Sequence, residues 1–132
     1  MNKKIHFIGI AGVAIAPIAK MLKDMGWIVT GSDEDVFDPI LTYLKVNNID
    51  WQEGFDAQRV QDVDMVLIGG GAVLKHSNNV ELEEAKRLNK KIVTFAEILE
   101  EILVKKESIV VAGTYGKTTT SGILAYIFEV LG

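Results

Sequence analysis

Apolar residues occur along this chain in two arrangements. Short continuous runs rich in isoleucine and valine predict buried strands, and segments whose apolar residues recur every three or four positions predict amphipathic helices. These patterns place strands at residues 5–10, 27–30, 49–52, 64–68 and 91–95, and helices at 14–25, 39–46, 79–88 and 96–103. The regular alternation predicts an α/β fold: a Rossmann-like doubly wound parallel sheet, with ligands at the carboxyl ends of its strands.

A polar interruption precedes the end of the chain. Lys105-Lys106-Glu107 breaks the apolar pattern and predicts a linker, so we assign 1–104 to one domain and 105–132 to the truncated start of another. A strand at 108–112 then leads through a glycine-rich turn into a helix. The apolar stripe of this helix consists of Ile123, Leu124, Ile127, Phe128 and Leu131.

This stripe is too large to remain in water, because its burial is comparable in free energy to the stability of a whole domain. The helix would fold back on the first domain, pair with a second copy of the chain, or belong to a second domain missing from the sequence. We favour the third origin, so the sequence is interpreted as a fragment. Self-association through this helix is the expected behaviour of the chain alone.

The glycine-rich turn has the composition of a phosphate-binding loop. Gly113 and Gly116 let the backbone curl so that successive N–H groups face an anion, and the following helix adds the positive end of its dipole. Lys117 is placed to reach the β- and γ-phosphates, and the Thr118 hydroxyl to bind Mg²⁺. Val111 stands where the general spacing has another glycine. A strand–helix turn with an incidental Lys-Thr pair is therefore the alternative.

A second glycine-rich turn follows the first predicted strand. Gly9 and Gly12 take the place of a dinucleotide-binding fingerprint, with Ala11 replacing its second glycine, and Asp33 ends the next strand, where such folds contact a ribose hydroxyl. Alternatively the glycines serve only helix–sheet packing and Asp33 caps the following turn. The loop at 69–72 is interpreted equally well as a ligand-facing backbone or as a flexible connection.

Composition excludes several classes of function. The net charge of −4 favours no nucleic-acid partner, the absence of cysteine excludes disulfides and thiolate metal sites, and no apolar run is long enough for a membrane span. The N-terminus shows no signal-peptide pattern, so we expect a cytoplasmic protein. We expect His6 to be packed in the core and His76 to be exposed. The charged residues of the helix at 79–88 are predicted to form a solvated face and not a catalytic carboxylate cluster; they are Glu81, Glu83, Glu84, Lys86 and Arg87.

Taken together, these motifs resemble the Mur ligases of peptidoglycan synthesis. The resemblance rests on Ile5–Ile10, Gly12, Gly31-Ser32-Asp33, Ala96–Leu99 and the run Gly113–Thr120. It accounts for Val111, because Gly-x-x-Gly-Lys-Thr is the spacing in this family. It also implies a Rossmann-like domain that binds a UDP sugar, a central ATPase domain that this chain only begins, and a third domain for the amino acid.

The resemblance also implies site residues. The UDP sugar would contact Gly9, Ile10, Ala11, Gly12, Val13, Asp33, Gly70, Gly71 and Ala72. ATP would bind Gly113, Thr114, Tyr115, Gly116, Lys117, Thr118 and Thr119, with Lys117 and Thr118 catalytic and Thr118 holding Mg²⁺. The implied ligase joins L-alanine, or alternatively murein tripeptide, to the carboxylate of UDP-N-acetylmuramate through an acyl phosphate. We expect this fragment by itself to bind a uridine nucleotide and to be inactive.

Two other classes of function remain open on the sequence. An NAD-binding Rossmann module would explain Gly9, Gly12 and Asp33 but would leave Gly116-Lys117-Thr118 without a role. A non-catalytic binding or regulatory protein could keep the same fold.

Overall fold

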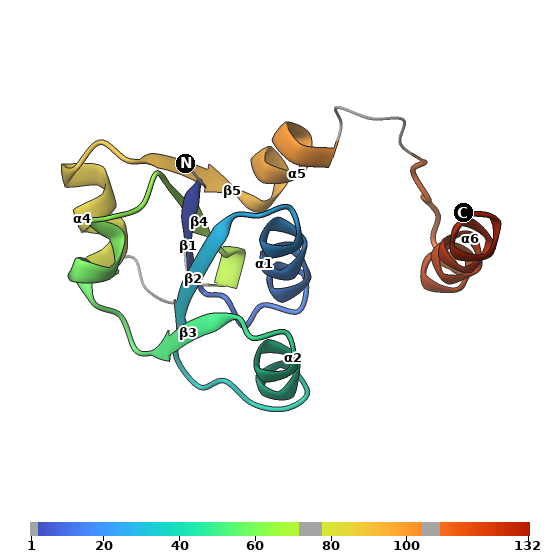
Figure 1. Ribbon diagram of the computed structural model, residues 1–132, viewed down its shortest axis with the longest axis horizontal. Coiled ribbons are helices and arrows are strands. Elements are labelled where there is room, and N and C mark those ends of the chain that lie inside the picture. The colour runs from blue at the N-terminus through green and yellow to red at the C-terminus, as the bar shows by residue number, and fades with distance from the viewer. Residues whose placement is uncertain (1–2, 72–77, 104–108) are drawn as a thin grey trace.

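The computed structural model describes residues 3–71, 78–103 and 109–132. The strands are β1 (Lys4–Ile8), β2 (Ile28–Asp33), β3 (Asp50–Glu53), β4 (Met65–Ile68) and β5 (Lys91–Thr94). The helices are α1 (Ile15–Asp24), α2 (Ile40–Val46), the 3₁₀ turn η1 (Ala57–Val60), α4 (Val80–Arg87), α5 (Phe95–Leu103) and α6 (Lys117–Leu131). Figure 1 shows their arrangement.

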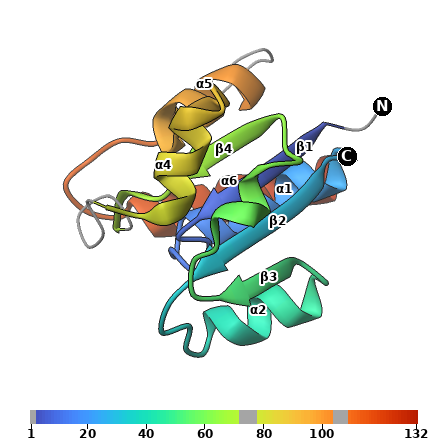
Figure 2. The ribbon, with the colours of Figure 1, turned by 90° about the vertical axis from the view of Figure 1, so that its left-hand side faces the viewer.

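The five strands form one parallel sheet in the order β3-β2-β1-β4-β5. Figure 2 shows β4, β1, β2 and β3 side by side. This order confirms the predicted doubly wound fold. The chain moves outward from β1 to β3 and then crosses back to place β4 on the other side of β1. The direction of winding therefore reverses between β1 and β4, and the carboxyl ends of these two strands border the crevice where such sheets bind ligands.

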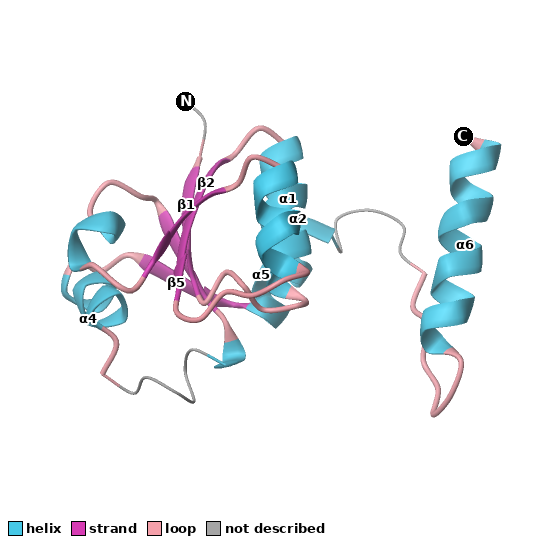
Figure 3. Ribbon diagram, turned by 90° about the horizontal axis from the view of Figure 1, so that it is seen from below, coloured by secondary structure: helices cyan, strands magenta, loops and turns pink. Residues whose placement is uncertain are grey.

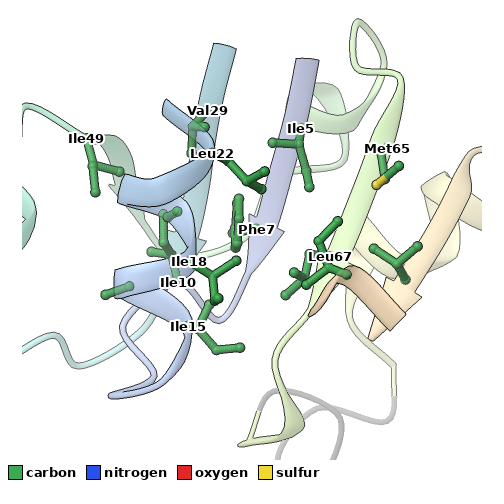
Figure 4. Close-up of a cluster of buried hydrophobic side chains, with 14 of the residues drawn as sticks. Ile5, Phe7, Ile10, Ile15, Ile18, Leu22, Val29, Ile49, Met65 and Leu67 are labelled. Carbon is green, nitrogen blue, oxygen red and sulfur yellow. The ribbon is translucent and has the colours of Figure 1, made fainter. Parts of the chain in front are cut away.

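Helices cover both faces of the sheet (Figure 3). Ile5 and Phe7 of β1 face α1, α2 and α5, and the next side chain, Ile8, faces η1 and α4, because successive residues of a strand point to opposite sides. Figure 4 shows the larger cluster, in which Phe7 lies among side chains of α1 such as Ile18 and Leu22. Burial on both faces explains why the strands appear in the sequence as continuous apolar runs.

Several predicted boundaries differ from the observed ones. β1 ends at Ile8, two residues early, because Gly9 adopts a positive φ of 83° and turns the chain. The 3₁₀ turn η1, capped by the Asp56 side chain, was not predicted because one turn is too short to show a helical period. The described residues 109–112 form no strand, since an isolated extended segment has no neighbour with which to pair.

The C-terminal helix α6 lies apart from the sheet (Figure 1). None of its residues is buried, and Phe128 and Leu131 are 58% and 78% exposed. The apolar stripe is therefore not folded back on the first domain. The predicted domain boundary at 104 lies outside the described residues.

Within the three described ranges, no helix combines the length and the apolar character needed to cross a membrane.

Candidate functional site

A cleft of about 430 Å³ lies at the carboxyl edge of the sheet, where the winding direction reverses. It is bordered by the glycine-rich turns that follow β1 and β4, by the acidic end of β2, and by an aromatic residue that follows β3. Its lining residues are Gly9, Ala11, Gly12, Ile15, Asp33, Glu34, Asp35, Phe55, Gly69, Gly70 and Gly71. Loops from four parallel strands thus meet at one site.

The turn after β1 is held against β2 by backbone hydrogen bonds. The N–H groups of Gly9 and Ile10 both donate to the Ser32 carbonyl, at 2.8 and 3.1 Å. The turn after β4 approaches so closely that a Cβ on Gly69 would lie 3.0 Å from the Gly9 carbonyl oxygen. Glycine at 69 therefore allows the two turns to meet, and this close approach shapes the floor of the cleft.

Asp33 connects the end of β2 to the first turn. Its Oδ2 accepts the Ala11 N–H at 2.7 Å, and its Oδ1 accepts the Glu34 N–H at 2.8 Å. The structure therefore shows the turn-capping role that the sequence left as an alternative. Each carboxylate oxygen has a second acceptor position, so a ribose hydroxyl can still be bound.

The N-terminus of α1 also faces this region. The helix begins without a side-chain cap and carries no acidic residue in its first turn. Its positive dipole end is therefore not neutralised from within the helix, and it favours an anion such as a diphosphate. The carboxylates of Glu34 and Asp35, which also line the cleft, disfavour an anion. They favour a ligand that also offers hydroxyl groups as hydrogen-bond donors.

Six of the nine residues predicted to contact the UDP sugar line the cleft: Gly9, Ala11, Gly12, Asp33, Gly70 and Gly71. Ile10 contributes its backbone to the turn, but its side chain is fully buried in the core, and Val13 is 81% exposed outside the lining. Ala72 lies outside the described residues, as does His76.

The sequence interpretation missed part of the lining, of which Phe55 is the main member. Phe55 follows β3 directly after Gly54, at the carboxyl edge of the sheet. Its position after a short, polar strand was the available signal. β3 has the weakest apolar pattern of the predicted strands, so the sequence gives no sign that the residue after it lines a ligand site.

The predicted solvated face of α4 requires a correction. Glu81 is 0% exposed, whereas Glu83 is exposed on the same helix. Glu81 lies one turn before the buried Ala85, and so it faces the sheet. There it contacts His6, which is buried as predicted. The sequence around Glu81 does not indicate this inward position, because its neighbours are charged and the partners that stabilise the buried carboxylate lie far away in the sequence.

The predicted phosphate loop forms a turn that opens directly into α6. Gly116 adopts a left-handed conformation with φ 77° at the N-cap, and no side chain caps the helix. The Lys117 ammonium bends over the loop and lies 2.6 Å from the Gly113 carbonyl and 3.5 Å from that of Thr114. The ammonium and the uncapped N–H groups of the first turn thus share one end of the helix, an arrangement that suits a phosphate.

Metal binding has limited support from protein ligands. Among the residues that the structure describes, no group of three or more histidine, aspartate or glutamate side chains is placed to hold a metal ion. Thr118, in the first turn of α6, offers one hydroxyl. A Mg²⁺ ion there would take its other ligands from phosphate and water, as this ion commonly does.

Comparison with known proteins identifies the family. The sequence profile described as "Mur ligase family, catalytic domain" matches residues 4–107, and this range ends before the phosphate loop. The chain is 39% identical over 125 residues to UDP-N-acetylmuramate–L-alanine ligase of Pelobacter propionicus, an alignment that covers 95% of this chain and 26% of that protein. It thus spans about a quarter of the length of the curated relatives that it matches.

Solved structures agree with this assignment. The UDP-N-acetylmuramate:L-alanyl-gamma-D-glutamyl-meso-diaminopimelate ligase from Neisseria meningitides has a TM-score of 0.83 at 32% identity, over 100% of this chain and 41% of that one. UDP-N-acetylmuramate-alanine ligase from Thermotoga maritima has a TM-score of 0.83 at 28% identity, over 97% and 29%. Sequence profile, relatives and fold therefore agree, and the chain belongs to the Mur ligase family.

Proposed function

We propose that the first domain binds the UDP portion of UDP-N-acetylmuramate in the cleft between β1 and β4. The observation that carries this proposal is the cleft at the reversal of strand order, with Asp33 bonded to the Ala11 N–H. The Pelobacter propionicus and Neisseria meningitides proteins both carry UDP-N-acetylmuramate in their names, although the names differ in the second substrate. The nucleotide sugar that these names share supports the proposal.

In this proposal each part of the cleft has one task. The uncapped N-terminus of α1 and the glycine-rich turns accommodate the diphosphate, because backbone N–H groups can approach it without interference from side chains. Asp33 accepts a hydrogen bond from a ribose hydroxyl with its remaining lone pairs. Phe55 offers an aromatic face to the base.

The residues 113–119 would open the ATP-binding domain of the complete ligase. Bound ATP would phosphorylate the muramyl carboxylate, and the resulting acyl phosphate would be attacked by the amine of L-alanine. Lys117 would leave the Gly113 carbonyl and offset the charge that develops between the β- and γ-phosphates. The Thr118 hydroxyl would hold Mg²⁺. The uncapped α6 terminus and the nearby ammonium support this assignment.

We infer that the chain alone binds the sugar nucleotide but does not ligate, because it spans only about a quarter of its relatives. L-alanine is the second substrate that the name of the Pelobacter propionicus relative suggests. The name of the Neisseria meningitides structure supports the murein peptide as the alternative. We propose that this activity is cytoplasmic.

Calorimetric titration tests the proposal. The chain and its Lys117→Ala variant are titrated with UDP-N-acetylmuramate, with ATP and Mg²⁺, and with NADH. We expect the sugar nucleotide to bind both proteins equally, and any heat from ATP to be lost in the variant. Binding of NADH without binding of the sugar nucleotide would instead support a dinucleotide-binding module. Phosphate release that requires both UDP-N-acetylmuramate and alanine would contradict the inactivity of the chain alone.

A further inference from the structure

A cluster of buried polar side chains lies behind the cleft, on the face of the sheet that α4 covers. It consists of His6 from β1, Ser32 from β2 and Glu81 from α4, all of which are essentially inaccessible to solvent. None of the three lines the described part of the cleft. The proposed function therefore gives these three side chains no contact with the ligand. Burying a carboxylate is nevertheless costly and requires compensating partners.

One oxygen of Glu81 holds the segment that follows β3. Glu81 Oε1 accepts the Asp56 N–H at 3.0 Å. It also lies 3.6 Å from Nη1 of Arg59, which in turn donates to the Gly54 carbonyl at 2.6 Å. Residues 54 and 56 flank Phe55, so Glu81 holds both sides of the aromatic wall of the cleft.

The other oxygen of Glu81 holds the end of β2. Glu81 Oε2 accepts the Ser32 hydroxyl and lies 3.3 Å from Nε2 of His6. The other ring nitrogen of His6 lies 2.8 Å from the Thr30 hydroxyl. Both ring nitrogens of His6 therefore have a polar partner, one in α4 and one in β2.

Ser32 also contacts the turn after β1, which forms a second wall of the cleft. Its carbonyl accepts the N–H groups of both Gly9 and Ile10, which form the turn after β1. One carboxylate is thus joined to the glycine turn through Ser32 and to the Phe55 segment through the Asp56 N–H. Gly9 of the first wall and Phe55 of the second both line the cleft.

The position of Glu81 is itself fixed. The Asn79 side chain caps α4 by accepting the N–H groups of Glu81 and Leu82, at 2.9 and 3.1 Å. On the same face of the sheet, Val60 and Ala85 belong to an apolar cluster. An apolar side chain would fill this space without the cost of desolvating a charge, but it could not accept hydrogen bonds from two separate loops.

We propose that Glu81 is a positioning residue for the nucleotide cleft: its carboxylate sets the separation of the Gly9–Ile10 turn and the Phe55 segment, and thereby the affinity for a uridine diphosphate sugar. The proposal deepens the proposed function and rests on it. Because recognition depends on the placement of both walls, loss of one connection lowers affinity although no ligand contact is removed.

The test uses Glu81→Gln in the complete chain, titrated with UDP. Glutamine keeps the size of the side chain but has one acceptor oxygen instead of two, so it cannot accept from both the Asp56 N–H and the Ser32 hydroxyl. We expect the dissociation constant to rise at least about tenfold, because small displacements of binding groups have effects of this order. Faster hydrogen exchange at the Asp56, Gly9 or Ile10 amide should accompany this loss.

Two control variants separate positioning from stability. Glu83→Gln makes the same chemical change at an exposed position of α4, and Val60→Ala destabilises the apolar cluster on the same face of the sheet without removing a hydrogen-bond partner of Glu81. All titrations are made where circular dichroism shows each variant to be folded. Both controls should bind UDP as the parent chain does. If Glu81→Gln fails to fold, Ser32→Ala replaces it, since that change removes one connection and leaves the carbonyl in place.

Each outcome decides a separate question. Parent-like affinity and exchange in Glu81→Gln would overturn the positioning role and leave the proposed function intact. Equal loss of affinity in Val60→Ala would also overturn it, because stability would then explain the effect. Failure of the parent chain to bind UDP would overturn the proposed function, and the positioning role with it.

Discussion

Gly31 packs directly against the side chain of Ile10. Gly31 lies in the middle of β2, and a Cβ added there would meet Ile10 at 2.4 Å from Cδ1 and 2.8 Å from Cβ. The first distance is about 1 Å below ordinary van der Waals contact, and the Ile10 side chain is fully buried among the residues of Figure 4. Gly31→Ala should therefore displace Ile10 and lower the free energy of unfolding by about 1–3 kcal/mol, the usual cost of overpacking.

Urea unfolding monitored by tryptophan fluorescence measures this effect, because Trp27 and Trp51 both pack against the main core. Gly70→Ala is the matched control, since a Cβ there meets nothing within 4 Å, and it should leave the midpoint unchanged. Ile10→Ala removes the atom nearest to the new methyl group. In a double-mutant cycle the double variant should therefore lose less free energy of unfolding than the sum of the losses in the two single variants, by about 0.5–3 kcal/mol.

A free energy of unfolding for Gly31→Ala within about 0.5 kcal/mol of the parent chain, which is the range of neutral surface changes, would refute this reasoning. It would mean that Ile10 moves into free space without cost. Additive effects in the cycle would refute it equally, because they would show that the two side chains do not meet.

Three further predictions concern the cleft, pH and association. Asp33→Ala leaves the Ala11 N–H without its acceptor and should weaken UDP binding about tenfold or more in calorimetry, since hydrogen bonds to charged groups contribute about 1.5–3 kcal/mol each; unchanged affinity would exclude Asp33 from the site. The Thr42 hydroxyl and N–H lower the pKa of Asp38 below its ordinary 3.8, so the stabilisation is present above that value and is lost as the pH falls through the lowered pKa. Thr42→Val should thus lower the Tm at neutral pH but not in strong acid, and a pH-independent difference would contradict this linkage. Phe128→Glu places a charge on the exposed face of α6 and should abolish concentration-dependent sedimentation of the chain, whereas a parent chain that is monomeric at all concentrations would contradict self-association.

Much of the fold was predictable because its signals are local. A strand buried on both faces must be apolar at successive positions, and this requirement marks β1 and β4 in the sequence. The turn before α6 depends on glycines within one short segment, so the sequence was sufficient to predict the turn, and its role as a phosphate loop stays a prediction. The position of Asp33 followed from the end of β2 in the same way.

Residues of the site that depend on distant partners were not predictable. Glu81 looked like one solvated acid among several, because its partner His6 lies 75 positions away in the sequence. Phe55 follows a short polar strand and becomes a cleft residue only when β3 pairs beside β2. Ile10 stands inside the predicted binding motif, yet its side chain packs into the core while only its backbone serves the turn.

The sequence by itself determined the α/β class and the glycine-rich turns, because hydrophobic period and backbone freedom are properties of neighbouring residues. Only the tertiary structure decided the strand order, and with it the cleft between β1 and β4, because pairing joins segments that are far apart in the chain. It also decided which carboxylate is solvated and which is buried. A glutamate can be buried only where donors from several separate segments converge on it, and here the folded sheet brings together His6, Ser32 and Asp56.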